Sequence, residues 1–369
     1  MPPLRVGIIS AAWGTFAHLP AWRAVPGIEV VAVCTSRQET AERAATRCAI
    51  ARPFWDAQKM AADPDIDIVD CGTRPSIREA MALACLNNGK HVYNAIPFAA
   101  GLDGARRLHD AWRQAGTVGV VDAFSEWVPA HRLAKEMIDE GYLGQPFGGT
   151  CIFNMSLFNK LNPQFPYNWF AQAGLGVSAV RNLGSQALHM LNFLFGDIAE
   201  LVAHDGQLLN EWRAPDGTTI KSETNDFASI LVRFESGMVI QCQVSWNATL
   251  GSGWTLDVFG SNGRIVARAP SFPTSRDTTL HAGKLGDTAP QPIEIPQRFL
   301  HSPDILVDAN AEIQPTHPMA LSMHAMAKAI RGEGHARPDF AQAWKVERAL
   351  EAVRRSVADR RWVRLDEIA

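Results

Sequence analysis

Three polar side chains are spaced so that a single helix would carry them on one face. Asn182, Gln186 and His189 stand at positions i, i+4 and i+7 of an apolar stretch that predicts a helix over 183–195. Of the three, only His189 has an ordinary pKa suited to proton transfer near neutral pH. The pattern makes His189 a candidate general acid or base, and a helical histidine held by hydrogen bonds is the structural alternative.

A second polar group stands at the ends of two predicted strands. Tyr93 and Asn94 end one apolar run, Asp122 ends the next, and Glu126 follows closely. The carboxyl ends of parallel strands form the edge of a sheet at which ligands bind. We therefore expect Tyr93 and Asp122 to take part in proton transfer, and Asn94 and Glu126 to contact the substrate.

Basic side chains elsewhere could complete an acid–base group with these carboxylates. Asp122 or Glu126 could pair with Arg181, which precedes the predicted helix, or with His189. The alternative is that either carboxylate caps a helix or pairs with another lysine or arginine. Arg181, Asn182 and Gln186 are interpreted as substrate contacts.

The segment 159–170 is aromatic, proline-rich and polar, which is typical of a lid or a pocket wall. It offers Lys160, Tyr167 and Trp169 as substrate contacts, and Lys160 could also carry a proton. A loop at a dimer contact is the alternative. We find no metal-ligand spacing, no nucleophile motif of the Gly-x-Ser-x-Gly type and no phosphate-binding Walker motif.

The first third of the chain alternates short apolar runs with amphipathic stretches, which is typical of a parallel sheet with helical crossovers. Asn88-Gly89 and Gly116 are helix-ending signals. Strands are predicted at 4–9, 28–34, 66–71, 91–94 and 117–122, and helices at 38–47, 75–88 and 102–115.

After about residue 125 the pattern changes to a predicted helix at 129–140 and a strand at 149–157. Consecutive strands with tight turns follow over 201–269, and they indicate an antiparallel sheet. Residues 270–316 look irregular, and two helices at 318–331 and 340–359 close the chain. We therefore predict a Rossmann-type doubly wound parallel sheet in a domain over 1–125 and an α+β domain with a largely antiparallel open sheet over 126–369.

Composition excludes several classes of partner. The 369 residues include 47% hydrophobic and 20% charged residues, with a formal net charge of −3, so no charge excess attracts nucleic acid or anionic lipid. No apolar run is long enough to span a membrane, and the amino terminus lacks a signal-peptide pattern, so we expect a cytoplasmic protein. Six scattered cysteines favour reduced thiols. Eleven tryptophans favour core packing, with an aromatic or sugar-like ligand as the alternative.

Several motifs, taken in chain order, resemble the glucose-fructose oxidoreductase and inositol dehydrogenase (Gfo/Idh/MocA) family. The opening Arg5-Val-Gly-Ile-Ile-Ser-Ala-Ala-Trp-Gly, the segment Gly89-Lys-His-Val-Tyr-Asn-Ala-Ile-Pro97 and the helix region 184–196 are similar to family segments. So are 225–237, the turn 259–263 and the closing helix 349–365. The resemblance implies nicotinamide cofactor binding, hydride transfer and a sheet face that builds a homodimer or homotetramer.

The phosphate loop departs from the family. A dinucleotide fingerprint needs glycines for a tight turn and for close approach of the backbone to the diphosphate. Those positions hold Ser10, Ala12 and Thr15, with Gly14 displaced among them. Small residues and hydroxyls still permit an anion at the helix start, and a turn that binds nothing is the alternative. The resemblance implies further cofactor contacts at Trp13 and Thr73.

The end of the second strand reads Thr35-Ser36-Arg37, where relatives often place an acid for the adenosine ribose. Ser36 and Arg37 can hydrogen-bond and neutralise a 2′-phosphate, so NADP is favoured and NAD is the second choice. Ser36 as a helix N-cap is the alternative interpretation.

The family's proton-transfer positions have also changed. The aligned residues are Ala95 and Ile96 for its glutamate and lysine, and Asn182 and Gln186 for its aspartate and histidine. None of these side chains ionises near neutral pH.

Three functional hypotheses follow. The first is an NAD(P)-dependent oxidoreductase acting on a small hydroxylated or carbonyl compound, sugar-like or aromatic, with His189, Tyr93 or Lys160 as a replacement proton carrier. The second is a non-redox enzyme, such as a lyase, isomerase or hydrolase, on the same scaffold. The third is a ligand-sensing protein without catalysis.

Overall fold

The computed structural model describes residues 2–159, 168–214, 216–311 and 315–369. The chain forms two compact units. Unit 1 contains the chain up to Trp127 together with His301–Trp344, and unit 2 contains Val128–Leu300 and Lys345–Ala369. The segment 301–344, which the sequence analysis placed in the second domain, thus packs with the first.

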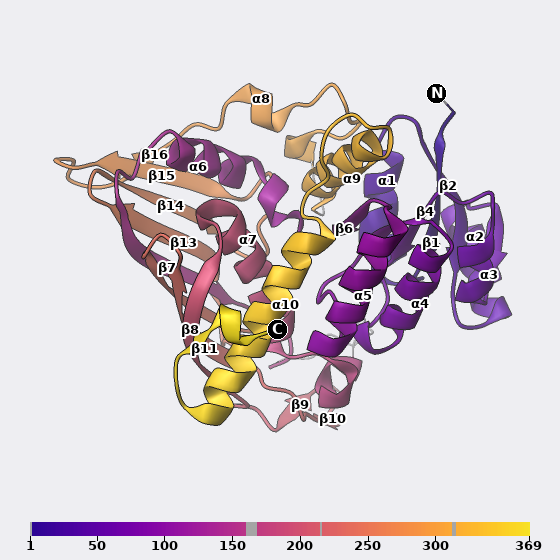
Figure 1. Cartoon of the computed structure of the whole chain (residues 1–369), viewed down its shortest axis with the longest axis horizontal. Helices are drawn as coiled ribbons and strands as arrows, with labels where there is room; N and C mark the ends of the chain where they lie inside the picture. The colour runs from indigo at the N-terminus through magenta and orange to yellow at the C-terminus, as the bar shows by residue number, and fades with distance from the viewer. Residues whose placement is uncertain (1, 160–167, 215, 312–314) are drawn as a thin grey trace. The chain divides into compact units, whose positions relative to one another are not determined.

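Unit 1 is built on a six-stranded parallel sheet in the order β3-β2-β1-β4-β5-β6 (Figure 1). This order confirms the predicted Rossmann-type sheet, whose strand order reverses between β1 and β4. Short β3 was not predicted because three residues that include a proline carry no readable alternation. The strands are β1 (Leu4–Ile9), β2 (Ile28–Cys34), β3 (Arg52–Phe54), β4 (Ile68–Cys71), β5 (His91–Asn94) and β6 (Gly119–Val121).

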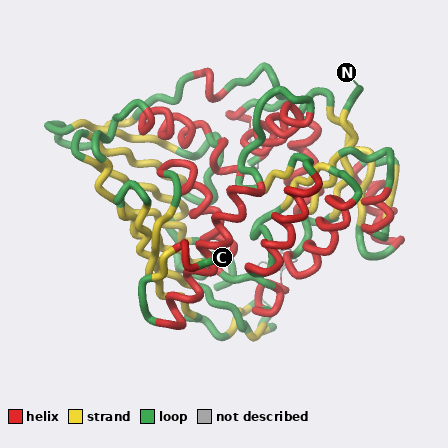
Figure 2. Tube along the Cα trace, viewed as in Figure 1, coloured by secondary structure: helices red, strands yellow, loops and turns green. Residues whose placement is uncertain are grey.

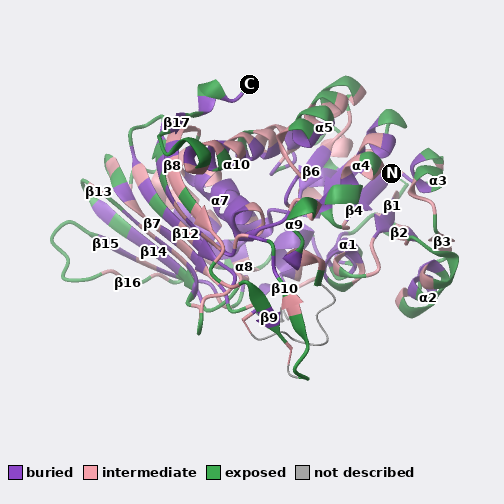
Figure 3. Cartoon of the chain, turned by 90° about the horizontal axis from the view of Figure 1, so that it is seen from below, coloured by how far each residue is buried: buried purple, intermediate pink, exposed green. Residues whose placement is uncertain are grey.

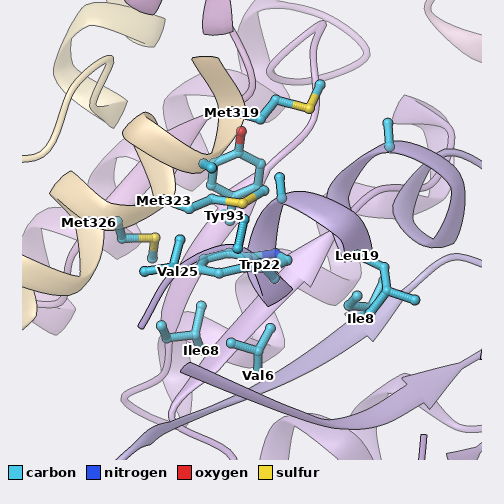
Figure 4. Close-up of a cluster of buried hydrophobic side chains, with 14 of the residues drawn as sticks. Val6, Ile8, Leu19, Trp22, Val25, Ile68, Tyr93, Met319, Met323 and Met326 are labelled. Atoms are coloured by element: carbon cyan, nitrogen blue, oxygen red, sulfur yellow. The ribbon is translucent and has the colours of Figure 1, made fainter. Parts of the chain in front are cut away.

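Two apolar layers cover the two faces of this sheet. One layer joins the sheet to α1, α2 and α9, and the other joins it to α3, α4 and α5. In the first layer Trp22 of α1 packs between strand side chains and the three methionines of α9 (Figure 4). The helices are η1 (Gly14–His18), α1 (Leu19–Arg23), α2 (Gln38–Cys48), α3 (Ala57–Ala62), α4 (Pro75–Asn87), α5 (Leu102–Ala115), η2 (Phe124–Trp127) and α9 (Thr316–Ile330).

The methionines explain why 301–344 belongs to unit 1. Met319, Met323 and Met326 recur every three to four residues along α9, so they share one face of that helix. All three are completely buried in the first apolar layer, which contains α1 and is called the α1 layer below (Figure 4). The helix therefore completes the core of the parallel sheet although it lies almost 200 residues beyond it in sequence.

Unit 2 is built on a nine-stranded sheet in the order β16-β15-β14-β13-β7-β12-β11-β8-β17. Neighbours are antiparallel except β7 and β12, which confirms the predicted largely antiparallel sheet. Its strands are β7 (Pro146–Asn154), β8 (Ile198–Gly206), β11 (Phe227–Phe234), β12 (Val239–Ser245), β13 (Gly253–Gly260), β14 (Gly263–Ala269), β15 (Thr279–Lys284), β16 (Gln291–Pro292) and β17 (Val363–Arg364); β9 (Glu211–Arg213) and β10 (Thr219–Lys221) form a separate pair.

The helices of unit 2 lie on one side of its sheet (Figure 2). They are α6 (Pro129–Asp139), α7 (Ser185–Phe195), the short α8 (Gln297–Leu300) and α10 (Phe340–Asp359), whose first turn counts with unit 1. Buried and exposed residues alternate along the strands, as expected for a sheet with one covered face (Figure 3). The region 270–316, expected to be irregular, contains β15, β16 and α8.

Candidate functional site

The loop between β1 and η1 turns around the side chain of Ser10. Its Oγ accepts the backbone N–H of Ala12 at 3.1 Å and that of Gly14 at 3.3 Å. The hydrogen of the Ser10 hydroxyl is left to donate to a ligand. Ala12 is exposed, and the hydroxyl of Thr15 donates to the carbonyl of Ala12 at 3.3 Å.

Two glycines let this loop lie close against the sheet. A methyl group on Gly14 would come within 2.7 Å of Ile8 Cγ2 and 2.9 Å of Ser10 Cβ. A methyl group on Gly72, just after β4, would come within 3.3 Å of the Gly14 backbone. The close packing of a dinucleotide loop against its sheet is therefore present here, and the residues that permit it are Gly14 and Gly72.

The end of β2 leaves two polar side chains exposed. Arg37 is the N-cap residue of α2 and no side chain caps the helix, so Ser36 does not cap it. The Thr35 hydroxyl instead donates to the carbonyl of Arg37 at 3.0 Å, which fixes the turn. Ser36 and Arg37 are both exposed, so both are free to contact an anion.

Three strand-end side chains of unit 1 lie on the face of the sheet that α1 covers. Side chains alternate along a strand, so Asp70 shares the face of Ile68, which packs in the α1 layer. Tyr93 of β5 packs in the same layer, and Asp122 follows Val120 of β6 by two residues. The alternation therefore directs two carboxyl groups and a phenol toward one helix.

His18, the last residue of η1 and the N-cap residue of α1, lies between the two carboxyl groups. His18 Nδ1 lies 2.9 Å from each oxygen of Asp70, and Nε2 lies 2.9 Å from Oδ2 of Asp122. Burial by itself lowers the pKa of His18, but the two carboxylates outweigh it and raise the pKa to about 10. At neutral pH the ring is a buried imidazolium that donates to both sides.

Three further donors complete what we call the His18 network (His18, Asp70, Asp122, Trp13, Trp22 and Tyr93). Trp22 Nε1 donates to Asp70 at 2.7 Å and Trp13 Nε1 to Asp122 at 3.1 Å. The Tyr93 hydroxyl donates to Asp122 at 3.0 Å, and burial, aided by that carboxylate, raises the pKa of the phenol well above its usual value.

The network changes the interpretation of two predicted proton carriers. Tyr93 is completely buried, and Asp122 accepts hydrogen bonds from three side chains. His18, Asp70 and Trp22 were not predicted from the sequence. The available signal was the four-residue spacing of His18 and Trp22 along a helix above strands that end in acids.

Glu126 is buried within unit 1 beside the last helix. Gln342 Nε2 donates to its Oε1. Burial raises the pKa of Glu126 to about 8, despite the opposing hydrogen bond from Gln342 and the charge of Arg337. At neutral pH its side chain is predominantly a neutral acid. Asp122 thus contacts His18, and Glu126 contacts Gln342.

The other predicted contacts of unit 1 are held by the loops after β4 and β5. Asn94 is completely buried, and its Nδ2 donates to the carbonyl of Phe98 at 2.8 Å. The carbonyl groups of Thr73 and Pro97 both accept from the buried Arg78 guanidinium, which ties the two loops together. Arg78 therefore organises the segment that carries Thr73.

In unit 2 the helix that carries the predicted acid–base group begins with a π-helical turn, η5 (Val180–Gly184), before α7. A π-helical turn is wider than an α-helical one, so Asn182 is offset from the face predicted for it. Gln186 and His189 lie in regular α7, and both are buried. Burial lowers the pKa of His189 to about 3, so its imidazole is neutral at neutral pH and is not a proton donor.

Arg181 is paired within unit 2. Its guanidinium lies 2.9 Å and 3.1 Å from the two carboxylate oxygens of Glu347, and Nε donates to the carbonyl of Gly176 at 3.1 Å. Glu347 is buried and was not singled out in the sequence, because a glutamate in a closing amphipathic helix has no distinctive pattern.

The predicted lid is described only in part. Lys160 and Tyr167 lie outside the described residues. Trp169 belongs to η3 (Asn168–Ala171), and its ring lies 4.2 Å from that of Phe170. Phe170 in turn contacts Phe158 and Trp246, so Trp169 borders an aromatic cluster of unit 2.

The described part of the chain contains neither a candidate metal centre nor a helix that could span a membrane. Among the residues that the structure describes, no three His, Cys, Asp or Glu side chains gather in a way that could hold a metal ion. Within the same part of the chain, no helix has both the length and the apolar character that crossing a bilayer requires.

Comparisons with known proteins match both halves of the chain. Residues 4–123 match the "Oxidoreductase family, NAD-binding Rossmann fold", and residues 131–266 match the "GFO/IDH/MocA C-terminal domain". Levoglucosan dehydrogenase of Pseudarthrobacter phenanthrenivorans is 24% identical over the full length of both chains. D-apiose dehydrogenase of Paraburkholderia graminis is 32% identical over 228 residues, which are 61% of this chain and 56% of that protein.

Solved structures share the whole fold. An NAD binding oxidoreductase from Klebsiella pneumoniae has a TM-score of 0.85 at 25% identity, over 98% of this chain and 99% of that one. Levoglucosan dehydrogenase in complex with NADH and L-sorbose has a TM-score of 0.86 at 23% identity, over 99% of each chain.

Proposed function

Because the chain belongs to the Gfo/Idh/MocA family of oxidoreductases, we propose that it is an NAD(P)-dependent enzyme that oxidises or reduces a small hydroxylated or carbonyl compound. Relatives named for levoglucosan, D-apiose and myo-inositol support a sugar-like substrate. The observation that carries the proposal is the phosphate loop, where Gly14 and Gly72 let the turn pack closely against the sheet, as a dinucleotide-binding turn does.

The loop and the end of β2 fit the two phosphate-bearing parts of the cofactor. The Ser10 hydroxyl and the start of η1 would hold the diphosphate, with Thr15 beside them. The exposed Ser36 and Arg37 would hold a 2′-phosphate, which favours NADP over NAD. When bound, the nicotinamide supplies a hydride donor or acceptor.

Few of the predicted proton carriers remain able to transfer a proton to or from the substrate. In this proposal Tyr93 and Asp122 position the loop through Trp13 and do not contact the substrate. His189 is neutral at pH 7, and an imidazole whose pKa is about 3 is too weak a base to carry the proton, so in this proposal it only exchanges a hydrogen bond with a substrate hydroxyl. Lys160 stays a predicted donor.

A second candidate is a protein that binds the cofactor without hydride turnover, either a non-redox enzyme or a ligand sensor. The observation that favours it is the chemistry of four side chains. The positions aligned with the family's proton-transfer residues hold Ala95, Ile96, Asn182 and Gln186, and none of them ionises near neutral pH.

One titration tests the proposal. Purified protein is titrated with NADPH and NADH while tryptophan fluorescence is followed, since Trp13 lies on the phosphate loop. We expect saturable quenching with tighter binding of NADPH. Absence of binding to either cofactor would remove the proposed function. Binding followed by no change in absorbance at the NADPH band, across levoglucosan, D-apiose, 1,5-anhydro-D-fructose and myo-inositol, would favour the second candidate.

We also propose that the protein is a homodimer or homotetramer that works in the cytoplasm. The uncovered face of the unit 2 sheet carries Ile152, Leu231 and Phe259 on three strands, and the last two are exposed. All six cysteines are free thiols, which fits a reducing compartment. Light scattering on the wild type and a Phe259→Asp variant tests the assembly, and a monomeric wild type would refute it.

A further inference from the structure

We propose that Arg47, in the last turn of α2, is an anchor for the diphosphate of the dinucleotide cofactor. Its Nη2 donates to the carbonyl of Ala11 at 3.0 Å and lies 3.2 Å from the Thr15 hydroxyl. Ala11 and Thr15 lie on either side of the turn into η1, so one nitrogen fixes the guanidinium against the phosphate loop. This inference rests on the proposed cofactor binding and assigns a residue to it.

The loop lacks some of the donors that an anion would otherwise meet. The N–H groups of Ala12 and Gly14 point to Ser10 Oγ, so they are already engaged within the protein. An unmodified glycine fingerprint offers such N–H groups to the diphosphate. A side chain that brings its own donors to this place would restore the hydrogen bonds that the ligand loses.

Arg47 has those donors and its charge is not neutralised. With Nη2 on the loop, Nε and Nη1 keep three N–H groups. The side chain is exposed, and it takes part in no ion pair within the part of the chain that the structure describes. Glu39 of the same helix lies 3.8 Å from Arg43. A guanidinium with free donors and an unpaired charge favours phosphate.

The position on the loop selects the diphosphate over the 2′-phosphate. Arg47 contacts the β1–η1 turn, whereas the proposed 2′-phosphate contacts, Ser36 and Arg37, follow β2. NADH, NADPH and ADP-ribose all contain the diphosphate, and only NADPH contains the 2′-phosphate. The loss of Arg47 should therefore weaken all three ligands by a similar factor.

The test compares Arg47→Ala and Arg47→Lys with Arg43→Ala. Arg43 is a matched control because it is an exposed arginine one turn earlier on the same helix. Dissociation constants for NADPH, NADH and ADP-ribose are measured by tryptophan fluorescence at low and high salt, with the thermal midpoint of each ligand-free variant as a check of folding. We expect Arg47→Ala to weaken all three ligands about 10- to 100-fold, the range of charge-assisted hydrogen bonds.

The controls separate this inference from the function on which it rests. Arg47→Lys should lose less than Arg47→Ala because it keeps the charge, and Arg43→Ala should stay within about twofold of the wild type. A wild type that binds while Arg47→Ala binds equally well overturns the Arg47 assignment alone. A loss confined to NADPH also overturns it, because that result places Arg47 at the 2′-phosphate. A wild type that binds none of the ligands overturns both proposals.

Discussion

His18 is a cation buried between two carboxylates, and its position explains several features of unit 1. Its two ring nitrogens connect Asp70 in β4 with Asp122 just after β6. Because Trp13 donates to the same carboxylate, the phosphate loop is tied to the ends of these strands. Removing one member of such a buried group leaves an uncompensated charge. The network therefore holds the loop in place only while all of its members are present.

The charge of His18 predicts how stability depends on pH. Its pKa is about 10 in the folded protein and near 6.5 when unfolded, so its stabilisation is fully present below about pH 6.5 and is lost as pH rises through 10. We expect the free energy of unfolding to fall by about 1.4 kcal/mol per pH unit from this group between pH 7 and 10. Urea unfolding at several pH values measures it.

A His18→Gln variant provides the comparison. It should be less stable than the wild type by about 3–5 kcal/mol near pH 7, because two buried carboxylates lose their cation. The difference should shrink toward pH 10. Parallel curves for the two proteins would contradict the assignment of a charged His18.

Glu126 makes the opposite contribution at neutral pH. Its pKa is about 8 in the folded protein and near 4.3 when unfolded, so the folded state keeps a proton that the unfolded state releases. Stability from this group is present below about pH 4.3 and is lost as pH rises to 8. We expect Glu126→Gln to raise the thermal midpoint at pH 8 and to leave it nearly unchanged at pH 4. Equal midpoints of the two proteins at pH 8 would show that Glu126 is not a buried neutral acid.

At the scale of elements, the β1–η1 turn shows how a loop can lose fingerprint glycines and keep its shape. Ser10 fills the turn and binds its N–H groups, while Gly14 keeps the contact with β1. The turn therefore depends on a residue with no Cβ at one position. The glycine that makes this contact, Gly14, does not stand at any of the glycine positions of the sequence motif.

Gly14→Ala tests this dependence. The new methyl group would clash with Ile8 Cγ2 and Ser10 Cβ, and overpacking of this kind costs about 1–3 kcal/mol. We expect a lower thermal midpoint and weaker binding of both NADPH and NADH. The control is Gly101→Ala, since Gly101 is extended and a Cβ there meets nothing within 4 Å. If both variants lose equal stability, the close contact at Gly14 is unimportant.

At the scale of the molecule, unit 1 is completed by a segment that arrives late in the chain. Met319, Met323 and Met326 of α9 pack against Trp22 and the sheet (Figure 4). Without α9 this apolar face would meet water, and a domain with one open core face has too little buried area to fold stably.

Fragments of the chain test this prediction. Residues 1–127 alone should lack a cooperative thermal transition, whereas 1–127 joined to 301–344 by a flexible glycine and serine linker should unfold cooperatively. Circular dichroism and tryptophan fluorescence measure both. A cooperatively folded 1–127 fragment would contradict the role of α9.

Periodicity in the sequence determined the elements of the chain. Alternation and apolar runs located β1, β2 and β5 at their observed bounds, and also α5 and α10, because side-chain repeats follow backbone geometry. We did not predict shorter elements such as β3 or the π-helical start of the α7 region, because they contain too few residues to show a period. The resemblance to the family rested on the same local segments and was confirmed by both domain matches.

Only the tertiary structure decided which side chains meet. The sequence singled out Asp122, Tyr93 and Trp13 separately, but it could not show that they share one acceptor, because their contacts span 29 and 109 positions. It also placed α9 in the wrong domain. Hydrogen bonds, burial and the resulting pKa values depend on distances between segments remote in sequence, and those distances exist only once the sheets and helices have packed.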